Sequence, residues 1–425
     1  MSLQMTENGI VHRHEDGTTT ILRPGRNGGS GTEIEVPQEL ADAYRLATGD
    51  VVEGPAEPLE SGEEDDQEDI PWEAAPPTEE TVSEVPASRF VSTERLTEIT
   101  LVNGLTPEEA EERPFPRTRR SHSERTPPDR WLALATGPED ATGRMLDFAA
   151  PLGNGCMGVI YGPHGSGLTR ALRSVGQGIA RNAPDCVLFL LLLRARSEEV
   201  TDWRRQFPQA DVVVCPSVIN AGTPEQTLRL ADLVLEAAQR QAEMGKDVVL
   251  LVDSLTGLWG AMLEAEEADA QREADQSQAR QRLREWVQKA GCFHGETPLG
   301  GSLGGSLTLV GTLWHQVVDE EAEEEGEVHP HLRLREHLIP EASWRVPLSA
   351  TLAQRHLYPA IDVKECLSQY EERLIPAPIQ ERLWTARGAL PRHDPLACYQ
   401  RLMEAIEATP DLDSLLQRLE SPPGP

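Results

Sequence analysis

Hydrophobic and polar positions alternate over the first fifty residues, and the pattern then changes to a different rhythm. A period of two is typical of half-buried strands, and Asp16-Gly17 between two such runs signals a hairpin. Together with "TEIEVP" and "LATGDVVEG", residues 9–54 therefore predict a small β-barrel of the oligonucleotide-binding (OB) kind. Residues 88–103 return to the same composition and are expected to supply its last strand.

From Trp131 onward the pattern predicts strands that alternate with helices. The continuous apolar run "CVLFLLLL" suits a strand of a parallel sheet covered on both faces, whereas "LTRALRSVGQGIARN" has helical periodicity. Further strands are expected at "GCMGVIYG", "DVVVCPS", "DVVLLVDS" and "GGSLTLVGTL". This order predicts an α/β domain with a mostly parallel sheet over residues 131–425.

Two segments between these regions lack a hydrophobic pattern. Residues 55–87 are acidic and rich in proline, which predicts a disordered insertion within the barrel segment, residues 1–54 and 88–103. Residues 104–130 contain the basic run "RPFPRTRRSHSER". We interpret this run as a solvated linker, with contact to nucleic acid as the alternative.

Overall composition narrows the range of functions. Carboxylates outnumber basic side chains by 71 to 39, and the net charge of −32 counts against non-specific binding to a phosphate backbone. The six cysteines form no CxxC pair, which argues against a zinc site and a disulfide framework. The longest apolar run is too short to span a bilayer. We therefore expect a cytoplasmic protein without a membrane segment.

The stretch "GPHGSGLT", residues 162–169, has the outline of a phosphate-binding loop, G-x-x-x-x-G-K-S/T. Its glycines allow backbone N–H groups to surround phosphate oxygens, and the Thr169 hydroxyl is suited to hold magnesium. Asp253, at the end of a later apolar strand, is suited to reach magnesium-bound water. Leu168, however, occupies the lysine position, and a charge-assisted hydrogen bond there contributes roughly 1.5–3 kcal/mol. The sequence thus predicts the loop but leaves binding of ATP and magnesium open.

Several motifs, in the same order, resemble the bacterial transcription termination factor Rho family. They are "EVPQELADAYRLATGDVVEG", "NGLTPEEAEERPFPR", "RMLDFAAPLGNGCMGVIYGPHGSGLT", "DCVLFLLLLRARSEEVTDW" and "YPAIDV". The resemblance covers residues 9–54 and 88–420. It implies a RecA-type P-loop domain preceded by an OB barrel, and a hexameric ring that threads RNA through its centre with ATP and dislodges RNA polymerase.

The resemblance also implies candidate residues for ATP. In the order of the chain they are Gly153, Gly155, Gly158, Gly162, Gly165, Ser166, Gly167, Leu168, Thr169, Arg170, Arg196 and Tyr358. Tyr358 takes the position of an aromatic residue beside adenine. Thr169 and Asp253 are the candidates for magnesium, if a nucleotide binds.

Three parts of the hydrolytic machinery depart from the family pattern. Leu168 replaces the lysine, and Ala195 replaces the glutamate that polarises the attacking water. Glu365 and Gln369 lie near the positions of arginines, one of which reaches into the neighbouring subunit's phosphate site. The joint loss predicts a dead or impaired ATPase.

The positions expected to contact RNA depart as well. The barrel strand carries threonines at 18–20 where the family has phenylalanines on which bases stack. The region of the pore loops, residues 317–329, carries carboxylates where the family has lysine. An acidic ring facing a pore and a solvated acidic loop both fit this segment. Either way, RNA binding is expected to be weakened.

Three hypotheses about function stay open on the sequence. The first is a Rho-like protein that does not turn over ATP and acts as a regulator, or as a subunit of a homo- or hetero-hexamer, with active Rho or RNA polymerase as partner. The second is an active RNA-dependent ATPase and helicase that terminates transcription. The third is a non-enzymatic acidic binding module that engages Rho. The sequence does not decide whether the chain is an enzyme.

Overall fold

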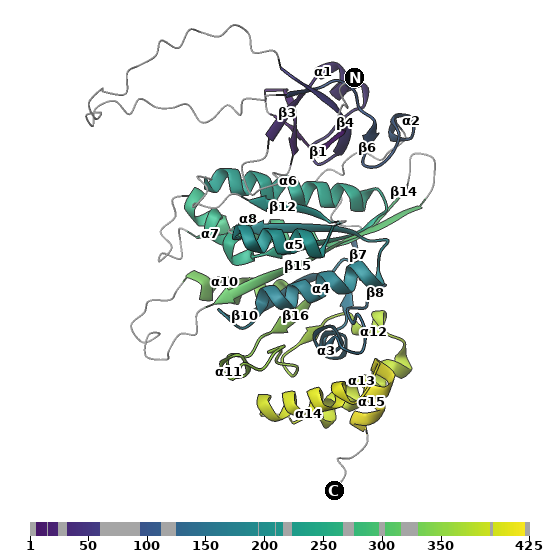
Figure 1. Ribbon diagram of the computed structural model, residues 1–425, viewed down its shortest axis with the longest axis vertical. Helices are drawn as coiled ribbons and strands as arrows, with labels where there is room; N and C mark the ends of the chain where they lie inside the picture. The colour runs from purple at the N-terminus through teal and green to yellow at the C-terminus, as the bar shows by residue number, and fades with distance from the viewer. Residues whose placement is uncertain are drawn as a thin grey trace, which may run out of the picture. The chain divides into compact units, whose positions relative to one another are not determined.

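The structure is a computed structural model. It describes residues 6–14, 16–23, 32–59, 94–111, 125–193, 195–208, 210–215, 223–266, 276–296, 302–315, 330–391 and 394–420. The described residues up to 111 form one compact unit, and those from 125 onward form a second (Figure 1). The predicted acidic insertion, the basic run and the acidic segment 317–329 fall largely or wholly outside the described residues.

The first unit is built on a closed barrel of short strands. Strand β1 pairs with both β2 and β4, which closes the order β1-β2-β3-β5-β4 into a ring, and β6 pairs with β4. Two short helices complete this unit. The bounds are β1 (Thr6–Arg13), β2 (Thr19–Arg23), β3 (Thr32–Val36), α1 (Gln38–Ala43), β4 (Val51–Pro58), β5 (Glu94–Leu96), β6 (Leu101–Val102) and α2 (Pro107–Glu111). The predicted OB-like barrel is therefore confirmed.

The barrel follows the alternation of the sequence. Apolar side chains that include Val11, Ile21 and Ile34 fill its interior. Gly17 turns the first hairpin at φ +88°, a backbone conformation that favours glycine. Strand β4 continues through Pro55 to Pro58, past the point where the sequence pattern placed the start of the insertion.

The second unit contains a mostly parallel sheet in the order β12-β11-β13-β15-β10-β16-β17. All neighbours from β12 to β16 are parallel, whereas β17 runs antiparallel to β16 and β14 antiparallel to β15. The bounds are β7 (Arg125–Thr126), β8 (Trp131–Leu132), β9 (Leu152–Gly153), β10 (Met157–Pro163), β11 (Val187–Leu193), β12 (Asp211–Cys215), β13 (Asp247–Asp253), β14 (Gly291–Glu296), β15 (Ser302–His315), β16 (Trp344–Pro347) and β17 (Leu367–Ser368).

Helices cover this sheet, and α13, α14 and α15 lie side by side near the C-terminus (Figure 1). Their bounds are α3 (Ala141–Ala149), α4 (Leu168–Asn182), α5 (Ser197–Gln206), α6 (Pro224–Glu243), α7 (Leu255–Ala265), α8 (Ser277–Val287), α10 (Pro330–Leu338), the 3₁₀ helix η3 (Ile339–Glu341), α11 (Ala350–Gln354), α12 (Glu371–Leu374), α13 (Ala377–Ala389), α14 (Pro395–Glu407) and α15 (Leu412–Glu420). The predicted RecA-type α/β fold is confirmed.

The parallel strands fix where the candidate residues meet. Because the carboxyl ends of parallel strands share one edge, the loop after β10, the residues after β11 and Asp253 at the end of β13 all lie along that edge. Strands β11 and β13 are buried almost throughout, as the continuous apolar runs predicted. None of the described helices has both the length and the apolar character needed to cross a membrane.

Candidate nucleotide site

The loop between β10 and α4 has the backbone shape of a phosphate cradle. Gly165 and Gly167 have φ values of +78° and +96°, in the left-handed region that side chains with a Cβ rarely adopt. Gly167 precedes α4 and offers no side chain to cap the helix. The first N–H groups of α4 are therefore left for an anion, which the helix dipole also favours.

Ser166 adds an unusual feature to this loop. Its side chain is buried, at 1% exposure, and its Oγ has no hydrogen-bond partner within the described protein. A buried hydroxyl without a partner destabilises a fold by about 1–3 kcal/mol. A ligand oxygen at the loop would relieve this, so the loop suits an anionic or polar ligand.

Leu168, the first residue of α4, is half-buried and packs against the main apolar core. Its side chain supplies contacts to the interior of the protein and no charge to the loop. Thr169 follows, with its hydroxyl hydrogen-bonded to Asp253, and Arg170 is exposed on the same helical turn. The loop therefore keeps the backbone donors and one hydroxyl without the cation.

Asp253 is the half-buried acid of the site. Its Oδ1 accepts a hydrogen bond from Thr312 Oγ1 on β15 at 2.7 Å, and Thr169 donates a second. Burial raises the pKa of the Asp253 carboxyl, and these two hydrogen bonds oppose the rise. Asp253 and Thr169 thus lie together where a magnesium ion would need them.

Two charged residues that the sequence reasoning missed also face Asp253. Arg173, one turn after Thr169 on α4, lowers the pKa of Asp253, and its guanidinium lies over the Trp203 ring at 5.0 Å. Its Nε is buried without a hydrogen-bond partner in the described protein. Glu199 on α5 raises the pKa of Asp253. No motif points to these residues, since only the fold brings α4 and α5 beside the end of β13.

The end of β11 lies next to this acid, because Leu192 is paired with Asp253. Ala195 is half-buried and packs against the apolar core, so no side chain there can orient water. Arg196 is exposed and immediately precedes α5, and its backbone N–H donates to the Glu199 carboxylate at 3.1 Å. Arg194 lies outside the described residues.

Tyr358 contacts the loop directly. Its hydroxyl donates to the Gly165 carbonyl at 3.1 Å, and a Cβ on Gly167 would lie 3.4 Å from its ring. Tyr399 donates in turn to the Tyr358 carbonyl at 3.0 Å. The structure therefore brings this predicted aromatic residue into contact with the loop.

The structure does not bring the earlier glycines to the loop. Gly158 lies one residue into β10, where a Cβ would meet Trp344 at 2.9 Å. Gly155 adopts φ +68° and lies against Cys292, and Gly153 lies against Leu374 and Pro128. These three positions allow close packing at the start of β10, while Gly162 at its end would place a Cβ 2.9 Å from Leu348.

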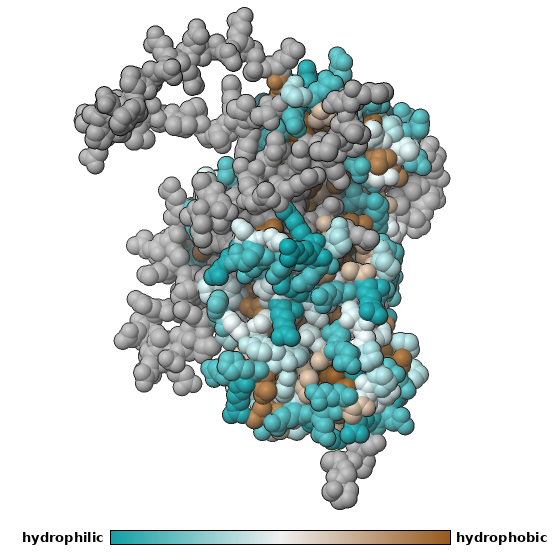
Figure 2. Space-filling model, viewed as in Figure 1, coloured by the Kyte–Doolittle hydropathy of each residue, from teal (hydrophilic) through white to brown (hydrophobic). Residues whose placement is uncertain are grey.

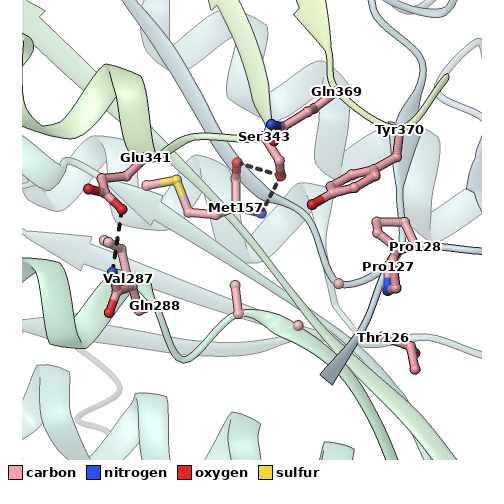
Figure 3. A pocket seen from close by; sticks show the side chains of 13 residues that line it. Thr126, Pro127, Pro128, Met157, Val287, Gln288, Glu341, Ser343, Gln369 and Tyr370 are labelled. Carbon is pink, nitrogen blue, oxygen red and sulfur yellow. Dashed lines mark hydrogen bonds between the residues drawn. The ribbon is translucent and has the colours of Figure 1, made fainter. Parts of the chain in front are cut away.

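Gln369 lies at the opposite edge of the sheet from the loop. Its backbone N–H donates to the Ser343 carbonyl, and Ser343 is bonded to Met157 at the start of β10. Seven-residue β10 separates Met157 from the loop by about 20 Å. Gln369 lines a cavity of about 310 Å³ with Glu341, Ser343 and Tyr370 (Figure 3). Glu365 is exposed.

The side chains at this site suit a magnesium ion better than they suit a nucleoside triphosphate. Mg²⁺ prefers oxygen ligands, and the Thr169 hydroxyl and the Asp253 carboxylate supply two. The loop N–H groups suit phosphate oxygens, but Leu168 supplies no charge beside them. The arrangement can hold a phosphate-bearing ligand with reduced electrostatic stabilisation.

Comparison with known proteins identifies the family. The sequence model for the ATP synthase alpha/beta family, nucleotide-binding domain, matches residues 143–368. Transcription termination factor Rho of Streptosporangium roseum is 31% identical over 333 residues, which cover 77% of this chain and 78% of that protein. The chain belongs to the transcription termination factor Rho family. Rho of Bacillus subtilis is 33% identical over 301 residues, 69% of this chain and 64% of that protein.

Rho family membership agrees with the order of motifs predicted from the sequence. The chain nevertheless spans less than two thirds of the length of the Bacillus subtilis relative. Two solved ATPases of type III secretion systems share the fold. One is described as a prototypical ATPase (TM-score 0.52, 16% identity, 70% of this chain and 87% of that one), and the other is assembled EscN of enteropathogenic E. coli (TM-score 0.52, 16% identity, 79% and 78%).

Proposed function

We propose that this chain is a Rho-family protein that keeps the nucleotide-binding scaffold but does not hydrolyse ATP. It acts as a regulator or as a subunit of a hexameric ring. The proposal rests on which side chains lie at the phosphate-binding loop and at the neighbouring strand ends. The backbone cradle, Thr169 and Asp253 are present, whereas Leu168 packs against the core and Ala195, two residues after β11, carries no carboxylate.

These residues allow ATP to bind but not to be hydrolysed. Backbone N–H groups bind phosphate oxygens regardless of which side chain occupies position 168. Hydrolysis also needs a group that orients water and a cation at the transferred phosphate. Ala195 cannot orient water, and Gln369, near the expected arginine-finger position, carries no charge for a neighbouring subunit. Weak binding of Mg·ATP without turnover is the expected behaviour.

The test compares ATP affinity and phosphate release in the wild type, in Leu168→Lys, in a triple variant and in a control variant. Leu168→Lys should bind Mg·ATP about ten- to a hundredfold more tightly in calorimetry, because one charge-assisted hydrogen bond is restored. It should still release no phosphate above a no-protein control. Adding Ala195→Glu and Gln369→Arg to Leu168→Lys should produce measurable hydrolysis if these positions account for the loss.

The matched control is Gln177→Lys, which adds the same charge to an exposed position of α4 away from the loop. It should leave ATP affinity unchanged. Phosphate release by the wild type, with RNA and magnesium present, would refute the proposal. The proposed regulatory role is tested by adding the chain to Rho of Bacillus subtilis and measuring the ATPase activity of Rho. If that activity falls further as the proportion of added chain rises, entry of the chain into the Rho ring is supported. An unchanged activity at every ratio would count against that role.

A second candidate function, an active ATPase with altered chemistry, is favoured by one observation. Arg173 and Glu199 bring a cation and a carboxylate toward Asp253, the two kinds of group that the loop has lost. In that case wild-type hydrolysis would be present and would disappear in both Arg173→Met and Glu199→Gln. These two variants therefore separate altered chemistry from contamination by another ATPase.

A further inference from the structure

The cavity that Gln369 lines lies at the opposite edge of the sheet from the phosphate-binding loop, and its wall carries several polar side chains (Figure 3). Its volume is about 310 Å³, at the lower end of the range of natural small-molecule pockets. Segments far apart in the chain form the wall: the residues from β7 to β8, the turn into β10, the end of α8, η3 and the two residues after β17. The fold therefore builds a second concave site, separate from the nucleotide loop.

The charge in the wall of this cavity is of one sign. Glu341 is the charged side chain of the lining, and no lysine, arginine or histidine belongs to it. An anionic ligand would therefore be repelled, and the net charge of −32 on the chain adds to that repulsion at long range. A cation would instead meet a carboxylate within a favourable field.

The Glu341 carboxylate keeps room for a further hydrogen-bond donor. Its Oε1 pairs with Arg284 of α8 at 3.0 Å, and the two side chains are 31% and 46% exposed, so this ion pair is a weak surface pair. Its Oε2 accepts from Gln288 Nε2 at 3.4 Å, which is longer than the usual range of about 2.7–3.2 Å for N–H···O bonds. A ligand N–H at a normal distance would therefore be a better partner for Oε2 than Gln288 is.

The other side of the cavity is polar but uncharged. Gln369 and Tyr370 line it, and Figure 3 shows the Tyr370 hydroxyl directed toward Ser343 and Met157. Ser343 Oγ is already bonded to both backbone groups of Met157, whereas the side chains of Gln369 and Tyr370 form no hydrogen bond within the described part of the chain. Both can donate and accept hydrogen bonds, and the Tyr370 ring offers an aromatic surface that suits an organic cation.

We propose that this cavity binds a small organic cation that carries N–H donors, such as an amidinium or a guanidinium. An N–H of the cation donates to Glu341 Oε2, and the body of the molecule extends toward Tyr370. The Gln369 amide and the Tyr370 hydroxyl are then available to its remaining polar groups. The proposal does not depend on ATP binding or on ring assembly.

The experiment compares benzamidinium, benzamide and benzoate, which are similar in shape and are cationic, neutral and anionic, respectively. Their affinities for the full chain are measured by ligand-observed NMR titration. Benzamidinium should bind saturably and about fivefold more tightly than benzamide, because it gains a charge-assisted hydrogen bond to a partly exposed carboxylate. Benzoate should bind more weakly than benzamide. Equal binding of benzamidinium and benzamide, tighter binding of benzoate, or no saturable binding of benzamidinium would each overturn the proposal.

Two variants localise the binding, and both replace exposed residues, so the fold should tolerate them. Glu341→Gln should lower the affinity for benzamidinium to that for benzamide, while benzamide binds as before. Gln369→Trp places a large ring into the cavity and should abolish binding of both probes. Glu404→Gln, at an exposed position of α14 outside the cavity, removes the same charge and should bind like the wild type. A retained preference for benzamidinium in Glu341→Gln, or retained binding in Gln369→Trp, would contradict the assignment.

Discussion

At the scale of single residues, Asp147 is the most strongly perturbed carboxyl group of the α3 region. It is buried at 4% exposure, and burial raises its pKa from an ordinary value near 3.8 to about 7. The backbone hydrogen bonds from Leu134 and Ala135 oppose the rise, and the nearby charge of Asp140 adds to it. The folded protein therefore holds a proton on Asp147 at pH values where the unfolded chain has released it.

This difference gives stability a defined pH dependence. An acid whose folded pKa is raised stabilises the fold less as pH rises, since the unfolded chain binds fewer protons. Between pH 5.5 and pH 8 the contribution of Asp147 should fall by about 2 kcal/mol. Asp147→Asn lacks this titration, so its thermal midpoint relative to the wild type should rise across the same interval. A constant difference between the two proteins at both pH values would contradict this prediction.

Residue types in a motif could be predicted from the sequence, whereas contacts between distant segments could not. The loop glycines, Thr169 and Asp253 follow from a strand-loop-helix pattern and an apolar run that ends in an acid. Arg173 and Glu199 were missed because their approach to Asp253 depends on how α4 and α5 pack beside β13. Gly158 was assigned to nucleotide from its family motif, but in the structure it packs under Trp344.

At the scale of elements, one buried side chain connects the C-terminal helices to the α/β core. Arg144 on α3 donates to the carbonyls of Ile406 and Asp411 and to the Thr409 hydroxyl, at 2.7, 3.3 and 2.9 Å. These acceptors lie at the end of α14 and in the turn before α15. Burial lowers the pKa of Arg144, yet these partners compensate part of the cost of burying the guanidinium.

Removing this connection should loosen α14 and α15 while the sheet stays intact. Arg144→Met removes the guanidinium hydrogen bonds to this turn, although the carbonyls of Ile406 and Asp411 keep backbone donors. The loss of these charge-assisted bonds should destabilise the protein by about 2–4 kcal/mol. Hydrogen exchange followed by mass spectrometry should show faster exchange in peptides from 395–420 than in those from β10 and β13. Arg382→Met is the control, because Arg382 pairs with Asp413 and Glu420 of α15 at the surface. It should cost under about 1 kcal/mol; equal effects of both variants would contradict the proposed role of Arg144.

Most elements of the α/β unit could be predicted from their hydrophobic period. The helix at 168–182 and the strands β10, β11 and β13 lie where the pattern placed them, because long apolar runs and a clear helical stripe leave little ambiguity. The pattern did not predict strands β7, β8, β9, β14, β16 and β17. They are short or rich in glycine, and their pairing is supplied by the fold rather than by local propensity.

At the scale of the whole molecule, the chain is strongly acidic, and the part of it that the structure describes exposes few large apolar side chains. The face in Figure 2 is mostly hydrophilic where it is coloured, and Leu367 and Trp384 are the large hydrophobic side chains exposed among the described residues. With a net charge of −32, the chain repels other polyanions at long range. The OB-like barrel shares its fold with proteins that bind single-stranded nucleic acid, and this repulsion opposes such binding.

The barrel also lacks the aromatic side chains on which bases would stack along β2. Thr19 and Thr20 are buried, at 2% and 8% exposure, and Thr20 is hydrogen-bonded to His14 at 2.9 Å. Aromatic stacking contributes about 1–3 kcal/mol per base in single-strand binders, and threonine has no ring to provide it. Neither the long-range charge nor the local surface of β2 therefore favours RNA.

We predict that a labelled 15-nucleotide RNA shows no saturable binding to the full chain at 100 mM salt, as measured by fluorescence anisotropy. When a protein neutralises RNA phosphates, its association constant falls steeply as the salt concentration rises. Repeating the measurement at several salt concentrations therefore reveals a local basic site despite the negative net charge. The informative control replaces Arg117, Arg119 and Arg120, in the basic run outside the described residues, with glutamine. Tight wild-type binding with a steep salt slope, lost in this triple variant, would mean that a local basic segment overcomes the repulsion of an acidic molecule.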